Sequence, residues 1–339
     1  MARQLLSGVE GDEWGALAAR LPVGWEVAAQ TTGALERRRV FRTPRELFQA
    51  ICCIVVGQCP LVEAAAWIAA SGGPDVSAVA LHKRLKRCGA WFAWMLAQYG
   101  VRARAPLPSW GRRVLVADAT VITQPGSRGT DYRIHGLLNL GDLRWAGCVV
   151  TDAHGGEHLR RWASEPGDLI LADRGYATPS NIAVAVAQGA DVLIRWKRAQ
   201  SGLRRRDGTR LDLGALVAAA RPATQVIDQP SALRQTAGPL LPGRLIAFRG
   251  EREDWVFLWT TLPRAIRAAR LIQLYRARWQ VELVFKRFKS LGEVDDLPNT
   301  LPATAHAWLT AACTIQVLLD DWIADEAVAL PPPARCRAA

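Results

Sequence analysis

The sequence predicts an α/β protein in which a helical N-terminal domain precedes a strand-rich core. Two observations lead to this prediction. Residues 14–107 show the apolar spacing of helices and contain few strand-like runs. After Pro106 and Pro108, apolar runs typical of strands follow one another, with turn residues between them. We therefore divide the chain into a helical domain at 1–108, a core at 109–325 and a loose tail at 326–339.

Two short helices are expected inside the helical domain, at 61–67 and 78–87, on either side of a Gly-Gly-Pro break. The second helix contains four basic residues, Lys83, Arg84, Lys86 and Arg87. A basic helix of this kind can bind DNA, so the N-terminal unit is a candidate DNA-binding domain. The alternative is an ordinary solvated helix face with Leu81 and Leu85 packed inward, and the sequence does not decide between the two.

The core begins with consecutive strand-like segments and continues with alternating strands and helices. We expect strands at 114–122, 132–140, 143–151 and 169–172, a helix at 181–188 and a further strand at 191–196. Residues 201–254 are polar and punctuated by Gly and Pro, with short strand-like runs at 225–227 and 245–248, and are interpreted as a β-rich insertion. A strand at 256–261 then leads into two long helices, at 265–291 and 303–325.

The composition favours a nucleic-acid partner in the cytoplasm. The 339 residues have a formal net charge of +12, and Lys and Arg gain affinity for a polyanion by releasing its counterions. Coding bias toward Arg is the alternative source of this charge. The apolar stretch at 51–56 is too short to cross a bilayer, and residues 1–10 lack the pattern of a secretory signal, so no membrane is expected. Seven cysteines without a Cys-x-x-Cys spacing indicate reduced thiols.

Two aspartates lie in apolar strand-like runs of the core. Asp118 interrupts the run at 114–122, and Asp173 closes the run that Asp168 opens. A buried carboxylate is unfavourable without a cation or hydrogen-bond donors, so a metal or a polar network is expected beside each. Asp168 is the weaker candidate because it follows Gly167 and fits a turn. Either aspartate alone is more often structural than catalytic, and the pair together favours a site.

A third acidic residue lies in the helix expected at 265–291. At about 100° per residue, four of its side chains project from one stripe roughly 60° wide, and Lys286 extends that stripe. The four are Tyr275, Arg278, Glu282 and Lys289. A carboxylate flanked by cationic groups and a phenol suits a phosphate backbone lying across the helix. The alternative is an amphipathic helix with an ordinary ion pair between Arg278 and Glu282.

The spacing Tyr-x2-Arg-x3-Glu-x6-Lys resembles the signature of the insertion-sequence-four family of bacterial transposases. Asp118-Ala119-Thr120 is similar to the segment around the first aspartate of the family, and residues 172–176 to the segment around the second. The resemblance extends over roughly residues 40–320, including the helical N-terminal segment at 44–96. Ala119 departs from it, since a glycine is frequent there. Trp255 and Trp259, among fourteen tryptophans that mostly suit packing, are candidates for the contact to a flipped base.

The resemblance implies an RNase H-like catalytic core, interrupted by the β-rich insertion, that cleaves transposon ends and joins them to target DNA. Asp118, Asp173 and Glu282 would bind two Mg²⁺ ions, with Mn²⁺ as a substitute, because hard cations prefer oxygen ligands. Residues Tyr275, Arg278, Lys286 and Lys289 would hold DNA phosphates. A homodimer on double-stranded DNA, associated with the bacterial nucleoid, is also implied.

Three other functions compete with this interpretation. His154-Gly-Gly-Glu-His158 matches a zinc-peptidase pattern, but that pattern needs a helix and each glycine costs about 1 kcal/mol in a helix interior. We therefore expect a loop there. A DNA-binding protein with a silent catalytic centre, and a metal-dependent nuclease without strand transfer, stay open as alternatives.

Overall fold

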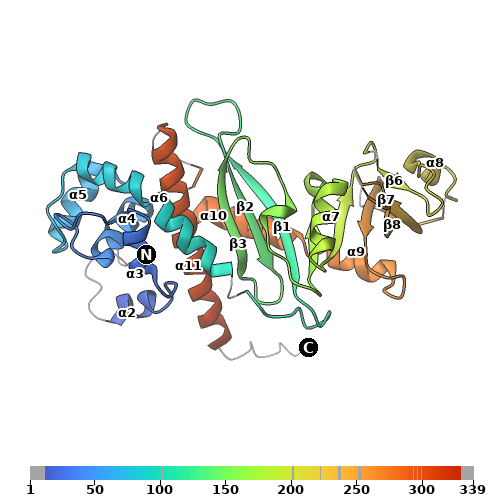
Figure 1. Cartoon of the computed structure of the whole chain (residues 1–339), viewed down its shortest axis with the longest axis horizontal. Coiled ribbons are helices and arrows are strands. Elements are labelled where there is room, and N and C mark those ends of the chain that lie inside the picture. Colours follow the sequence, from blue (N-terminus) through green and yellow to red (C-terminus); the bar gives the residue numbers. More distant parts are fainter. Residues whose placement is uncertain are drawn as a thin grey trace, which may run out of the picture.

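The computed structural model describes residues 12–100, 103–200, 202–221, 223–235, 238–250, 254–292, 294–295, 297–298 and 300–329. Figure 1 shows three parts along the long axis of the molecule: a group of N-terminal helices, a central region where long helices lie against strands, and a smaller strand-containing part. Among the described helices, none combines the length and the apolar character that a bilayer requires.

The N-terminal part is helical, as the sequence predicts. It contains α2 (Asp12–Ala18), α3 (Trp25–Thr31), α4 (Pro44–Gly57), α5 (Leu61–Ala70) and α6 (Ala78–Tyr99). The start of α4 is fixed by Thr43, whose hydroxyl accepts a hydrogen bond from the backbone N–H of Glu46 at 3.2 Å. Trp91 of α6 stacks on Trp25 of α3, with ring centroids 5.9 Å apart. An aromatic cluster therefore joins these helices far from the strands.

Within the described residues the strands form one nine-stranded sheet in the order β3-β2-β1-β4-β5-β9-β8-β7-β6. Its strands are β1 (Val114–Ile122), β2 (Tyr132–Asn139), β3 (Trp145–Asp152), β4 (Leu169–Ala172), β5 (Asp191–Trp196), β6 (Leu203–Arg204), β7 (Val226–Leu233), β8 (Leu241–Arg249) and β9 (Trp255–Thr260). The bounds of β1, β4 and β5 match the predicted ones. Short 3₁₀ turns, η2 (Leu159–Arg161) and η3 (Arg174–Tyr176), and helix α7 (Pro179–Ala187) connect β3, β4 and β5.

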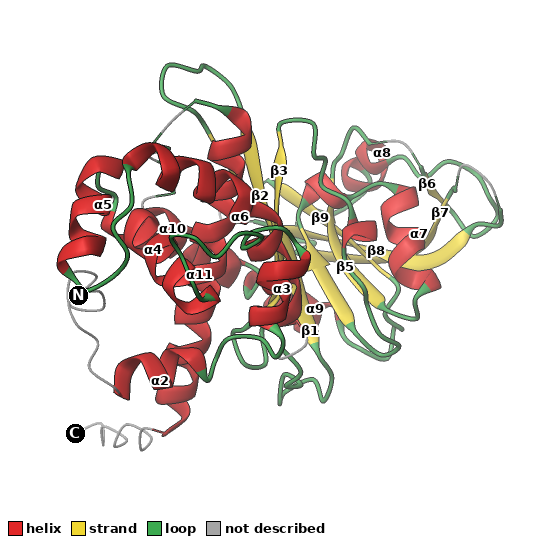
Figure 2. Ribbon diagram, turned by 60° about the vertical axis from the view of Figure 1, so that its left-hand side comes forward, coloured by secondary structure: helices red, strands yellow, loops and turns green. Residues whose placement is uncertain are grey.

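Strand β1 carries apolar side chains on both faces of the sheet. Val114 and Val116 pack into one hydrophobic core, which includes the long C-terminal helix. Leu115 and Ala117 pack into a second core on the opposite face, with α7. Successive side chains of a strand alternate between faces, so position 118 lies on the face of Val114 and Val116. Figure 2 shows the main group of helices on one side of the strands and α7 and α8 (Leu213–Ala218) on the other.

The segment interpreted as an insertion continues the sheet. Strands β7 and β8 are much longer than the runs predicted at 225–227 and 245–248, and β8 pairs with β9 in antiparallel orientation. The sequence underestimated them because polar side chains interrupt the alternation of apolar residues along β7. This β-rich part therefore extends the edge of the core sheet, where Figure 1 draws it at the far end from the N-terminal helices.

The prediction of a single long helix at 265–291 is wrong. The structure has two helices, α9 (Ala268–Arg276) and α10 (Trp279–Gly292). Between them the backbone N–H of Ala277 bonds to the carbonyl of Leu274 at 2.9 Å, and that of Arg278 to the carbonyl of Tyr275 at 3.1 Å. Hydrogen bonds across three residues tighten the chain and redirect it. The break contains neither Gly nor Pro, the residues that usually mark the end of a helix, so it could not be predicted from a local pattern.

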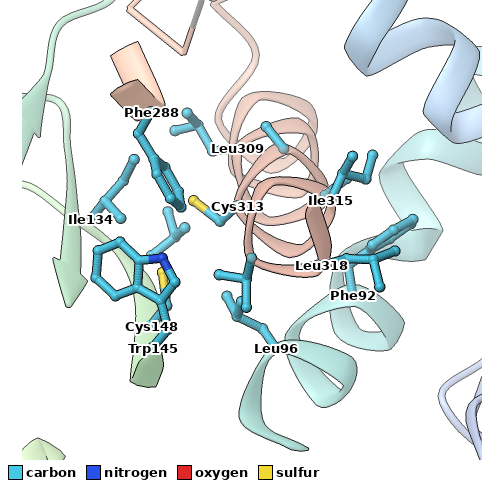
Figure 3. Packing of buried hydrophobic residues seen from close by; sticks show 14 of the residues in the cluster. Phe92, Leu96, Ile134, Trp145, Cys148, Phe288, Leu309, Cys313, Ile315 and Leu318 are labelled. Carbon is cyan, nitrogen blue, oxygen red and sulfur yellow. The ribbon is translucent and has the colours of Figure 1, made fainter. Parts of the chain in front are cut away.

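Helix α11 (Pro302–Ala329) lies between the sheet and α6. Figure 3 shows Cys313 and Leu309 of α11 beside Phe288 of α10 and Ile134 of β2, while Leu318 faces Phe92 of α6. A helix buried on opposite sides in this way joins the N-terminal helices to the core. Because α11 continues to Ala329, residues 326–329, predicted to belong to a loose tail, are helical, and residues 330–339 lie outside the described part.

A stability prediction follows from the contact between α10 and β3. Phe288 is fully buried, and its ring centroid lies 5.2 Å from that of Trp145. Replacing Phe288 with Ala should lower the free energy of unfolding by about 3–5 kcal/mol, through lost burial and a residual cavity. Urea unfolding measures this loss, and Ile323→Ala, at a position on α11 that is 58% exposed, is the control. A loss no larger than that of the control would contradict the packing.

Candidate active site

Asp118 and Asp173 lie side by side where the parallel pairing of β1 with β4 ends, Asp118 in the middle of β1 and Asp173 directly after β4. Strands β1 and β4 pair in parallel, and their register sets Ala117 opposite Ala172. The next residue of each chain segment is an aspartate. Asp173 also begins the 3₁₀ turn η3. In α/β sheets, ligands collect at the carboxyl ends of parallel strands, so this pairing gives the edge of the sheet its acidic character.

Helix α10 brings Glu282 to the same edge through an arginine. The Arg278 guanidinium donates from Nη1 to Oδ2 of Asp118 at 3.2 Å and from Nη2 to Oε1 of Glu282 at 2.5 Å. Its side chain is 13% exposed, compared with 18% for Asp118 and 41% for Glu282. Arg278 therefore links two acidic residues that are far apart in the sequence, in a partly buried setting where the ion pairs are only weakly screened.

Electrostatics at Asp118 report that the three acids are close. Burial is the largest influence on Asp118, and it raises the pKa of this residue from its ordinary 3.8 to about 6. The neighbouring N–H of Ala119 and the Arg278 charge oppose this rise in pKa, whereas the negative charges of Asp173 and Glu282 add to it. The carboxylates thus repel one another, and a bound cation would relieve that repulsion.

The chemistry of the donor set fits a hard divalent cation. Three carboxylates offer oxygen ligands only, and Oδ1 of Asp173 is buried with no hydrogen-bond partner among the described residues. An orphaned buried oxygen of this kind is expensive unless a cation or water satisfies it. Among the described residues, no three acidic, His or Cys side chains lie close enough together to hold a metal ion, and the Arg278 guanidinium contacts both Asp118 and Glu282.

Two other residues of the predicted stripe, Tyr275 and Lys289, contact the strands near these acids from two different helices. Tyr275, in the last turn of α9, donates from its hydroxyl to the carbonyl of Ala172 at 3.4 Å. Burial, ahead of the influence of nearby charges, raises the pKa of Tyr275, so it stays a neutral phenol. On α10, Lys289 donates to the carbonyl of Val121 at 3.0 Å and pairs with Asp295 at 3.0 Å. Lys286 is exposed.

The helical break corrects the geometry from which this stripe was predicted. Angles of 100° per residue do not apply across Ala277 and Arg278, because α9 ends before them and α10 begins after them. Tyr275 and Arg278 nevertheless meet, with the guanidinium 5.8 Å from the tyrosine ring centroid. The turn between the helices, rather than one helix face, brings the phenol and the guanidinium together.

The basic residues of α6 are divided between internal and exposed positions. Arg84 donates to the carbonyls of Ala34 at 3.3 Å and Arg37 at 3.0 Å. Lys83, Lys86 and Arg87 are exposed, and Arg87 pairs with Glu36 at 3.3 Å. Leu81 and Leu85 are buried, as the alternative of an ordinary amphipathic helix requires. Arg84 and Arg87 therefore hold the segment between α3 and α4, and the lysines are the more available pair.

Three sequence-based expectations about other residues can be compared with the structure. The segment from His154 to His158 is a turn and loop, so the helix that a zinc peptidase needs is absent from it. Trp259 is fully buried and cannot stack on a base in this conformation, and Trp255 stacks against Arg249 at 4.8 Å. Trp279, which sequence reasoning passed over, is 50% exposed at the start of α10. Its position directly after Arg278 is the signal that could have found it.

Comparisons with known proteins indicate the family of this chain. A family model described as "Transposase DDE domain" matches residues 109–317. The InsL protein for insertion sequence element IS186A of Escherichia coli (strain K12) is 30% identical over 353 aligned residues, covering 92% of this chain and 94% of that protein. The transposase for insertion sequence element IS421 of Escherichia coli is 30% identical over 354 aligned residues, with the same coverage. A solved piggyBac transposase synaptic complex with hairpin DNA matches with a TM-score of 0.49 and 9% identity, covering 96% of this chain and 75% of that one.

Proposed function

The chain belongs to the family of DDE-domain transposases, and from that premise we propose that Asp118, Asp173 and Glu282 form its catalytic centre. As a member of this family it is a DNA transposase, an enzyme that cleaves DNA and transfers strands. The family also implies dependence on divalent metal ions. The proposal concerns which residues of this chain carry those properties.

The Arg278 bridge is the observation that carries the proposal. Arg278 contacts both Asp118 and Glu282. Ala117 of β1 is paired with Ala172 of β4, and Asp118 and Asp173 are the residues that directly follow them. Three acids converging from β1, β4 and α10 without a functional reason would be a costly arrangement. A lone surface ion pair between Arg278 and Glu282 does not explain the contact to Asp118.

We propose two Mg²⁺ ions, with Mn²⁺ as a substitute, as the cations of this site. Bound there, they would act as Lewis acids that stabilise the attacking and leaving oxygens of an in-line phosphoryl displacement. Asp118, Asp173 and Glu282 would supply the oxygen ligands. Arg278 neutralises two of these carboxylates in the present conformation, so it has to release them for such binding.

Arg278, Tyr275, Lys286 and Lys289 are proposed to hold the DNA backbone. A guanidinium that releases carboxylates is free to bind a phosphate in the same fork geometry. Lys289 and Lys286 lie on the same helix and add positive charge, while the neutral phenol of Tyr275 donates a hydrogen bond. These contacts position the strand and carry no sequence information. DNA binding is also proposed for the N-terminal domain, through the basic residues of α6, Lys83, Arg84, Lys86 and Arg87.

The strand order β3-β2-β1-β4-β5, antiparallel and then parallel, supports an RNase H-like core interrupted by the β-rich part at 201–254. We further propose a homodimer on double-stranded DNA, because a transposon has two ends and this chain supplies one centre. Action on chromosomal DNA would set it in the bacterial cytoplasm at the nucleoid.

An assay with labelled element ends, target DNA and Mg²⁺ tests the proposed function. The expected products are cleaved ends that later become joined to the target. Cleavage without joining would favour a stand-alone nuclease, and binding without cleavage would favour a silent DNA-binding protein. Removal of divalent cations with a chelator should abolish both the cleavage of the ends and their joining to the target.

Lys289→Ala should weaken binding to pre-cleaved end DNA by about 10-fold, since a charged hydrogen bond contributes about 1.5–3 kcal/mol. The lysine is held near the acids by the carbonyl of Val121, which sets its charge at the edge of the site. Fluorescence anisotropy at several salt concentrations measures both the affinity and its salt slope, which should fall by about one unit per lost phosphate contact. Arg276→Ala removes an exposed charge at the end of α9 and is the control. Equal losses in the two variants would contradict a specific phosphate contact.

A further inference from the structure

The loop after β3 reaches the same edge of the sheet as the candidate active site. It contains the segment from His154 to His158, whose zinc-peptidase interpretation fails because it is not helical. Two of its backbone carbonyls are held by arginines: Arg133 donates to Gly155 at 3.3 Å and Arg161 to Gly156 at 3.0 Å. Such charged hydrogen bonds fix the backbone of a loop that carries an acidic residue.

That acidic residue, Glu157, is anchored at its own backbone. Asn181, at the start of α7, donates from Nδ2 to the carbonyl of Glu157 at 2.9 Å, and Oδ1 of the same amide lies 3.3 Å from Nδ1 of His158. Asn181 is itself buried. The backbone on both sides of Glu157 is therefore held, and the direction of its side chain is set by the loop.

The Glu157 carboxylate occupies the side-chain space of Gly175. A Cβ atom at position 175 would lie 1.5 Å from Oε2 of Glu157, closer than any real contact. Gly175 is in η3, two residues after Asp173, and its φ is not in the positive range that favours glycine. Gly175 therefore leaves space for the Glu157 carboxylate, and its backbone conformation does not by itself require a glycine.

Buried polar atoms beside this carboxylate lack partners. Tyr176 is 1% exposed, and its hydroxyl has no hydrogen-bond partner among the described residues. Burial first, and then the negative charges of Glu157 and Asp118, raise the pKa of Tyr176. Oδ1 of Asp173 is likewise buried and unpartnered. These two orphaned polar atoms belong to the residues on either side of Arg174 and Gly175, and Gly175 contacts the Glu157 carboxylate, so a bound species is expected there.

We propose that Glu157 is a fourth acidic residue of the divalent-cation site, acting on the side of Asp173. This inference rests on the metal site given under the proposed function and adds a residue that the three-acid pattern omits. Burial is the largest influence on Glu157 and raises its pKa; the charge of Asp173 adds to this rise, and the charges of Arg133 and Lys197 oppose it. Glu157 acts as a positioning residue for the hydrated cation, and the Tyr176 hydroxyl completes the hydrogen bonding of that hydration shell. Ligand-supporting groups of this kind change metal affinity by about 10–100-fold.

Titration of the DNA-free full chain with Mn²⁺, followed by electron paramagnetic resonance, tests the proposal. Glu157→Gln keeps the shape of the side chain and removes its charge. We expect it to bind Mn²⁺ about 10-fold more weakly than the unchanged chain, with no decrease in the thermal midpoint of the metal-free protein. Glu63→Gln, at an exposed position on α5, is the matched control and should bind as the unchanged chain does.

A second variant displaces the carboxylate without removing it. Gly175→Ala sets a methyl group where Oε2 now lies, so Glu157 has to turn away, and the same weakening is expected. Mn²⁺ affinity that is unchanged in Glu157→Gln would overturn the proposal, whatever the thermal midpoint. If instead Asp173→Asn also binds Mn²⁺ like the unchanged chain, the underlying metal site is wrong, so the two failures are distinguished.

Discussion

Glu282→Gln should lower the rate of end cleavage by on the order of 10⁴-fold or more, the usual scale for loss of a catalytic group. The amide keeps an oxygen that can accept the hydrogen bond from Arg278, which lies 2.5 Å away in the native protein. The substitution removes the negative charge of the carboxylate, which a divalent cation requires of this ligand. Binding to end DNA should stay nearly intact, because the Glu282 carboxylate has no hydrogen bond to donate to a phosphate.

Single-turnover cleavage of labelled ends measures the rate, and anisotropy on pre-cleaved ends measures binding. Glu26→Gln, at an exposed position on α3, is the matched control and should cleave normally. Cleavage retained in Glu282→Gln would remove this residue from the centre, and lost DNA binding would show that the side chain supports the fold instead. The combination of full binding and no cleavage is specific to a catalytic carboxylate.

The parts of the fold that sequence reasoning found are those determined by local patterns. Strand β4, the first half of β1 and the centre of β5 are buried on both faces and appear as short apolar runs. Helix α6 begins at a Ser77 cap and has apolar residues at helical spacing. Each of these signals lies within the segment that it describes, so one sequence is enough to find it.

The features that were missed depend on contacts between distant segments. The break between α9 and α10 has no Gly or Pro, and it brings Tyr275 and Arg278 to the strand ends through packing. Arg278 pairs with Glu282 four residues away, which a helical pattern predicts, but its contact with Asp118 spans 160 residues. Glu157 was overlooked for the same reason, because the space it fills belongs to Gly175 on another loop.

Sequence reasoning was therefore better at selecting candidate residues of the site than at predicting how those residues contact one another. A carboxylate inside an apolar strand is conspicuous because burial penalises it, and both strand aspartates were selected on that ground. The arginine that links Asp118 to Glu282 was assigned to DNA, and the structure adds a second set of partners for it. One guanidinium cannot fully satisfy carboxylates and a phosphate at once, so the proposed contact of Arg278 with DNA would belong to another state of the enzyme than these ion pairs.

Asp118→Asn should abolish cleavage and at the same time stabilise the metal-free protein above neutral pH. Burial raises the pKa of Asp118 from 3.8 to about 6 even though Arg278 lowers it. A carboxyl whose pKa is higher in the folded than in the unfolded chain contributes stability below pH 4 and loses it as the pH rises through about 6. At pH 8 the native protein therefore bears the full penalty of a buried, ionised Asp118.

Asparagine at position 118 avoids that penalty, so the free energy of unfolding at pH 8 in a chelator should rise by about 1–3 kcal/mol. The difference should vanish at pH 4, where both side chains are neutral. Urea unfolding at the two pH values checks this, and adding Mg²⁺ should stabilise the native chain more than the variant, since a ligand stabilises only the state that binds it. A variant less stable than the native chain at pH 8 would mean that the ion pair with Arg278 outweighs desolvation. A carboxylate that destabilises the empty protein, yet is required for cleavage, is retained for the cation it binds and not for the fold.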